Sequence, residues 1–62
     1  MKYSELLRII KKNGWKFDRH GTRHDLYIND DIPNVQIPIA RHIAKEVPTG
    51  TLNEIYKAAG LK

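Results

Sequence analysis

The hydrophobic period of the sequence changes twice, from helical near the N-terminus to alternating in the middle and back to helical near the C-terminus. The first apolar side chains recur at spacings of three and four residues, which places them on one face of a helix: Tyr3, Leu6, Leu7 and Ile10. Ser4 is a suitable N-cap for this helix. Asn13-Gly14 is expected to end it, because glycine readily adopts the left-handed conformation that follows a helix.

A second helix is predicted near the C-terminus from the same spacing, in Leu52, Ile55, Tyr56 and Ala59. Thr51 and Glu54 have the spacing of a capping box, with Thr49 as the alternative cap. Gly60 is expected to end this helix.

Three segments with alternating polarity lie between the helices and predict strands over residues 15–18, 26–28 and 35–39. The expected connections are residues 20–22 and 29–34, and a loop over 41–48 that covers Ile43 and Val47. Pro38 lacks an amide donor, so it should lie on an edge strand or at a strand end. The predicted fold is a single α+β domain over residues 1–62, with order α-β-β-β-α. Both helices should cover one face of an antiparallel sheet whose core includes Trp15 and Phe17.

The faces of the second strand follow from the same alternation. Residue parity groups His24 with Leu26 and Ile28, which predicts a partly sheltered imidazole that faces the helices. Arg23, Asp25 and Tyr27 should then lie on the exposed face. Asp25 either forms a surface ion pair with Arg23 or orients a catalytic base. Tyr27 either stacks on a nucleic-acid base or packs as a cross-strand aromatic.

Composition limits the classes of function. A chain of 62 residues without cysteine has no disulfide or thiolate metal site and only a thin core, which favours a bound protein partner. Eleven Lys and Arg against seven Asp and Glu give a net charge of +4, which favours a polyanionic partner. No apolar run is long enough for a signal peptide or a membrane span, so a soluble cytoplasmic protein is expected.

The segment from Arg19 to Tyr27 concentrates two arginines, two histidines, an acid and a phenol. Metal-free RNA cleavage needs a base for the ribose 2′-hydroxyl, an acid for the leaving oxygen and a cation for the phosphate. Histidine and arginine can supply these roles, although such a cluster also suits simple RNA binding. The three histidines lack the spacing or the carboxylate cluster of a zinc site, so neither a metal nor another cofactor is expected.

Short motifs in order along nearly the whole chain resemble the HicA mRNA interferase family. They are Asn13-Gly14-Trp15, the run from Gly21 to Tyr27, the run from Ile37 to His42, Thr49-Gly50-Thr51-Leu52 and Ala58-Ala59-Gly60-Leu61. The resemblance implies a double-stranded-RNA-binding-domain-like fold, cleavage of single-stranded mRNA, and neutralisation by a HicB-like antitoxin protein. It also implies that His24, which follows Gly21-Thr22-Arg23, is the catalytic histidine. The family often has proline before the Arg41-His42 pair, where this chain has Ala40, so the shape of that loop is a point of difference.

Residues predicted to contact RNA are Gly21, Thr22, Arg23, Tyr27, Arg41, His42, Lys16 and Arg19. His20 and His42 are secondary candidates for a general acid. Two alternatives stay open. The chain could be a non-catalytic double-stranded RNA-binding module, although the start of its second helix lacks the lysine cluster typical of such modules. It could also be a basic interaction protein in which His24 lies at the rim of the core.

Overall fold

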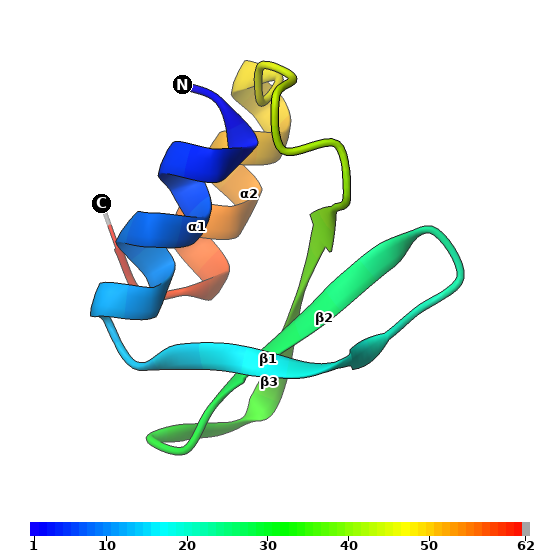
Figure 1. Ribbon diagram of the computed structural model, residues 1–62. Helices are drawn as coiled ribbons and strands as arrows, with labels where there is room; N and C mark the ends of the chain where they lie inside the picture. Colours follow the sequence, from blue (N-terminus) through cyan, green and yellow to red (C-terminus); the bar gives the residue numbers. More distant parts are fainter. Residues whose placement is uncertain (62) are drawn as a thin grey trace.

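Two helices pack on one face of a three-stranded antiparallel sheet (Figure 1). The computed structural model describes residues 1–61. The elements are α1 (Tyr3–Lys12), β1 (Trp15–His20), β2 (His24–Asn29), β3 (Ile32–Ala40) and α2 (Thr49–Ala58). The predicted α+β order α-β-β-β-α is therefore confirmed, and the strands lie in the order β1-β2-β3. In residues 1–61, no helix is long and apolar enough to cross a membrane.

Helix α1 buries the predicted apolar face, with Tyr3, Leu6 and Ile10 in the core. Its start differs from the prediction, because Lys2 rather than Ser4 is the N-cap. The backbone N–H groups of Tyr3 and Ser4 donate to carbonyl oxygens of the loop after β3, each at 3.0 Å. The free N–H groups at the start of α1 are therefore satisfied by carbonyl oxygens of that loop, so no capping side-chain hydroxyl is needed. Gly14 follows the helix with φ +92°, as predicted for a helix terminator.

Helix α2 begins two residues earlier than its predicted capping box. Pro48 is the N-cap, and its carbonyl accepts the N–H of Leu52 at 2.9 Å. Thr51 therefore lies inside the first turn, and the predicted capping box of Thr51 and Glu54 is wrong. Thr49, the alternative cap, is the first helical residue. Gly60 ends the helix region with φ +74°, as predicted.

The core lies between the helices and the sheet. Its largest fully buried side chains are Trp15, Leu6, Ile10, Ile37 and Ile39. Trp15 is a core residue as predicted, but Phe17 is 46% exposed and is not. In the loop over 41–48, Val47 is buried as expected, whereas Ile43 is exposed. Pro38 is exposed on β3, which is an edge strand, so its predicted placement is confirmed.

A shift of register between β2 and β3 reverses the predicted faces of β2. Asn29 pairs with Ile32, but Ile28 pairs with Gln36 and Tyr27 pairs with Ile37. Because directly paired residues share a face, Tyr27 lies on the core face with Ile37 and is 6% exposed. Leu26 and Ile28 therefore point to the opposite face, whereas His24, at the start of β2, lines a cleft shared with residues of α2. The prediction that Leu26 and Ile28 face the helices is wrong.

A bulge between β1 and β2 changes the faces of β1. Phe17 pairs with Tyr27, but Arg19 pairs with Leu26 and His20 with Asp25, so Asp18 is the additional residue. A bulge of one residue reverses the alternation beyond it. His20 therefore lies on the same face as Phe17 and Asp25, near the end of the β1–β2 hairpin, which extends away from the helices in Figure 1.

Asn29 is a buried polar residue that links the end of α1 to the β2–β3 turn. Its side-chain amide donates to the carbonyl of Asn13 at 3.0 Å, and its Oδ1 accepts the N–H of Asp31 at 2.9 Å. We predict that Asn29→Ala lowers the free energy of unfolding by about 1–3 kcal/mol, because two main-chain groups lose their partners. Urea unfolding measures this change. The exposed Asn34→Ala variant is the control and should change stability by less than about 0.5 kcal/mol.

Candidate active site at the end of the hairpin

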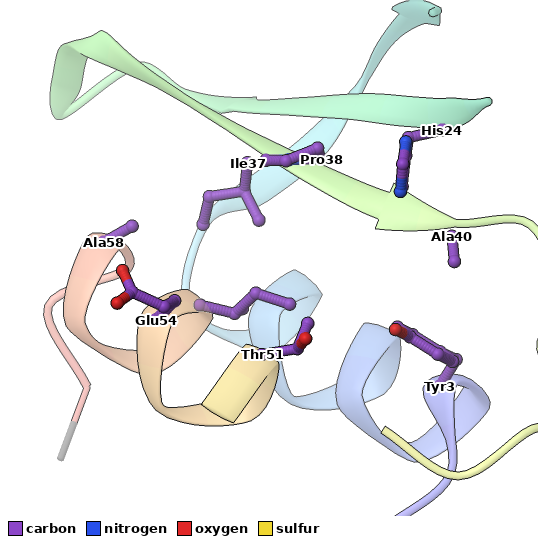
Figure 2. A pocket seen from close by; sticks show the side chains of 9 residues that line it. Tyr3, His24, Ile37, Pro38, Ala40, Thr51, Glu54 and Ala58 are labelled. Carbon is purple, nitrogen blue, oxygen red and sulfur yellow. The ribbon is translucent and has the colours of Figure 1, made fainter. Parts of the chain in front are cut away.

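His24 is the first residue of β2 and is exposed. Its ring extends from β2 beside the end of β3, while Tyr3, Thr51 and Glu54 lie on the helix side of the same space (Figure 2). This cleft has a volume of about 350 Å³. Within residues 1–61, the His24 ring has no hydrogen-bond partner. The predicted partly sheltered imidazole is therefore wrong, because His24 is exposed at the start of β2.

A second hollow, of about 480 Å³, lies on the other side of His24. It is bordered by Gly21, Thr22, Arg23, His24, Leu26 and Pro38. Four of these residues are consecutive, so the structure brings the predicted segment from Gly21 to His24 together around one concave surface. His24 is shared by both hollows and is thus accessible from each.

Gly21 allows the hairpin to close tightly. Its N–H donates to the carbonyl of His24 at 2.7 Å, and a Cβ at this position would lie 3.0 Å from that same oxygen. A side chain here would push against the backbone that carries His24. The connection predicted over residues 20–22 therefore turns tightly at Gly21.

Arg41 holds the hairpin connection from the end of β3. Its Nε donates to Asp25 Oδ1 at 2.9 Å, and its Nη2 donates to the carbonyl of Gly21 at 2.6 Å and to that of His24 at 3.4 Å. One guanidinium therefore joins both ends of the connection to β2. These donors are used inside the protein, so the geometry favours a positioning role for Arg41 over the predicted RNA contact.

The Asp25 carboxylate contacts two basic side chains, those of Arg41 and His20. Its Oδ1 accepts from Arg41 and also lies 2.7 Å from His20 Nδ1. The hydrogen bond from Arg41 is the main cause that lowers the pKa of the Asp25 carboxyl, and the hydrogen bond with His20 lowers it further. The expected surface pair of Arg23 with Asp25 is wrong, since the bulge places His20 opposite Asp25. Asp25 does orient a histidine, but that histidine is His20 rather than His24.

The other residues predicted to bind RNA are dispersed. Tyr27 is buried and makes an edge contact with Phe17 at 6.0 Å between ring centroids, so it is the cross-strand aromatic rather than a stacking surface. Burial raises the pKa of its phenol, which stays neutral. Lys16 pairs with Asp30 at 3.1 Å, at the opposite end of the hairpin, and Arg19 pairs with Asp18 at 2.6 Å.

His42, predicted both as an RNA contact and as a secondary general acid, lies exposed in the loop after β3. In residues 1–61, no three His, Asp or Glu side chains gather in a way that could hold a metal ion.

Sequence reasoning missed the helix side of the His24 cleft. Thr51 and Glu54 were assigned to a helix cap and Tyr3 to the core, yet all three line the cleft. The signal that could have found Thr51 and Glu54 is their position one turn apart on α2, which places them on one face of the helix. Thr51 and Glu54 line the cleft only because α2 packs beside the end of β3, and a local sequence pattern does not predict that packing.

Fold and site together define a small basic α+β domain with an exposed histidine beside a tight hairpin connection. A comparison with curated proteins finds no match. A family model described as "HicA toxin of bacterial toxin-antitoxin" matches residues 3–61. The chain therefore belongs to the HicA toxin family, and it is the toxin of a toxin–antitoxin system. Membership implies an antitoxin partner and an RNA target.

Arg41→Lys tests the positioning role. A lysine ammonium cannot donate to Asp25 and Gly21 in the fork geometry of a guanidinium, so the connection should open more often. We predict several-fold faster hydrogen exchange at the Gly21 amide by NMR and only a small loss in unfolding free energy, since the pair is partly exposed. Arg23→Lys, on the same connection, is the control. Equal exchange rates in the two variants would contradict the positioning role.

Asp25→Asn tests the electrostatic part of this network through pH. A carboxyl whose pKa is lowered on folding stabilises the fold above its ordinary pKa of 3.8 and ceases to do so as pH falls through the lowered value. Wild type should therefore be more stable than Asp25→Asn at about pH 6, and the difference should shrink towards about pH 2. Urea unfolding at a series of pH values measures it. Asp31→Asn, at an exposed carboxyl, should show a smaller pH-dependent difference.

Proposed function

We propose that this toxin is a metal-independent endoribonuclease that cleaves single-stranded mRNA in the cytoplasm through His24. The observation that carries the proposal is the exposed His24 imidazole, shared by two hollows and placed next to the connection of Gly21, Thr22 and Arg23. Family membership supports it by implying an RNA target. The net charge of +4 supports it further, because RNA is a polyanion.

The proposed reaction is a transesterification at one phosphodiester linkage. The ribose 2′-oxygen attacks the adjacent phosphorus while the bond from phosphorus to the 5′-oxygen breaks. A base takes the 2′-hydroxyl proton and an acid gives a proton to the leaving 5′-oxygen, so a 2′,3′-cyclic phosphate and a 5′-hydroxyl result. His24 serves as the general base or the general acid, since imidazole can do either near neutral pH.

The hairpin connection is proposed to bind the reacting phosphate. Arg23 is exposed beside His24 and can donate to phosphate oxygens, and the open hollow gives the backbone of Gly21 and Thr22 access to them. Arg41 keeps this connection in shape through its bonds to Gly21, His24 and Asp25. A phosphate held here would lie next to His24 without a metal ion.

A HicB-like antitoxin is proposed to inhibit the toxin by covering His24. The cleft between β3 and α2 is lined by apolar side chains such as Ile37 and Ile55 together with the polar Thr51 and Glu54. Such a mixture suits a protein segment, which can bury apolar groups and hydrogen-bond at the rim. A partner seated there would exclude RNA from His24.

The test compares wild type with His24→Ala and His24→Gln on single-stranded RNA in EDTA, with analysis of the product ends. Glutamine keeps hydrogen bonding but cannot transfer a proton at neutral pH, so both variants should lose about 10²–10⁴-fold in cleavage rate. Wild type should produce 2′,3′-cyclic phosphates. Both variants should fold and bind the antitoxin.

Asn53→Ala, on the exposed side of α2, is the control and should cleave like wild type. Products that carry 3′-hydroxyl ends would refute the proposed chemistry. Tight binding of duplex RNA with no cleavage by wild type would instead establish a non-catalytic double-stranded RNA-binding module.

A further inference from the structure

We propose that the exposed ring of Phe17, with His20 beside it, stacks on an unpaired base of the RNA substrate. This surface, the Phe17–His20 face, lies on the same side of the hairpin as Tyr27 and Asp25, and it is separate from the two hollows that His24 lines. The proposal rests on the proposed function, because it takes RNA as the substrate. It adds a second RNA contact that the His24 site does not contain.

The aromatic geometry leaves Phe17 both fixed and accessible. Tyr27 supports the Phe17 ring from the core side in an edge contact, with a centroid distance of 6.0 Å and an interplanar angle of 77°. The His20 ring lies 5.0 Å from it at 58°. Although it is held between two rings, Phe17 remains 46% exposed. A rigid aromatic ring with a free surface is suited to stacking on a nucleobase.

The backbone irregularity at Asp18 creates this surface. Without the additional residue, His20 would lie opposite His24 and on the other face of the sheet from Phe17. Bulges commonly redirect side chains beside functional sites. Asp25 then fixes the orientation of the His20 ring through the 2.7 Å contact with Nδ1, so the other ring nitrogen points away from that bond.

Cations around the ring favour RNA as the occupant over an apolar protein segment. The Nζ of Lys11 lies 6.0 Å from the centroid of the Tyr27 ring, so the last turn of α1 brings a positive charge next to the ring that Phe17 contacts. On the other side, Arg41 is bound to the same Asp25 that holds His20. An exposed ring in contact with a ring that Lys11 approaches suits a base attached to phosphates, whose binding combines stacking with charge attraction.

A single strand can contact both His24 and Phe17 if it passes around the end of the hairpin. The connection over residues 21–23 is short and extends away from the helices (Figure 1). A scissile linkage at His24 and a stacked base at Phe17 would then belong to different nucleotides of one strand. Duplex RNA is too stiff to make this turn, so the arrangement selects unpaired RNA.

The experiment uses RNA binding by proteins that carry His24→Ala, so that cleavage does not interfere. Fluorescence anisotropy at one fixed salt concentration compares a labelled oligoadenylate with an abasic oligomer of the same length. Phe17→Leu keeps an apolar side chain and removes the ring, whereas Phe17→Tyr keeps the ring. Ile43→Ala changes another exposed apolar residue, in the loop after β3, and is the matched control.

Phe17→Leu should bind oligoadenylate about tenfold more weakly, while Phe17→Tyr and Ile43→Ala bind like the parent. Binding of the abasic oligomer should be the same for all variants. The Phe17 ring protons should also move upfield in the NMR spectrum of the His24→Ala protein when oligoadenylate is added, and this readout needs no change at Phe17.

Three outcomes would overturn the inference: equal oligoadenylate binding by the Leu and Tyr variants, unmoved Phe17 ring protons at saturating RNA, or loss of antitoxin binding instead of RNA binding in Phe17→Leu. Failure here is distinct from failure of the nuclease proposal. If wild type cleaves RNA but Phe17→Leu binds normally, the stacking surface alone is wrong. If the ring protons move but no cleavage occurs, the nuclease proposal alone is wrong.

Discussion

Burial of the Tyr27 ring against Ile37 determines which way every side chain on β2 points. An aromatic ring removes a large apolar area from water, and a core this small has few side chains that can replace it. With Tyr27 inside, alternation places Asp25 on the same side, where its carboxylate meets His20 and Arg41. The polar network beside the candidate catalytic histidine is therefore a consequence of core packing two residues further along the strand.

Two irregularities of register, one in each pairing of β2, bring the side chains of the candidate site together. The shift before Asn29 aligns Tyr27 with Ile37, and the bulge at Asp18 brings His20 opposite Asp25. Because Asp25 then accepts from both His20 and Arg41, the ends of β1, β2 and β3 are joined at one carboxylate. The connection that carries His24 is thus held by polar contacts in a region that the helices do not cover.

The sequence predicted the elements well because each has a local cause. Helical spacing identified α1 and α2, and alternation identified the three strands with their order. The faces of β2 were not predictable in this way, because they depend on pairing. If the pairing of Asn29 with Ile32 continued without a shift, Leu26 would lie opposite Val35, on the core side, as the alternation suggested. The helix caps failed for a similar reason, since α1 receives its N-terminal acceptors from the loop over 41–48.

The division of β2 into two faces also bears on how a partner can control this protein. The core face is closed by the helices, so a partner can reach the site only at the hairpin end, along the β3–α2 cleft, or on the open face of the sheet. All three regions include or adjoin His24 or Arg41. A protein that binds only the folded toxin there stabilises it by mass action while it excludes RNA. For a chain of this size, with a thin core and no disulfide, inhibition and stabilisation would then come from the same contact.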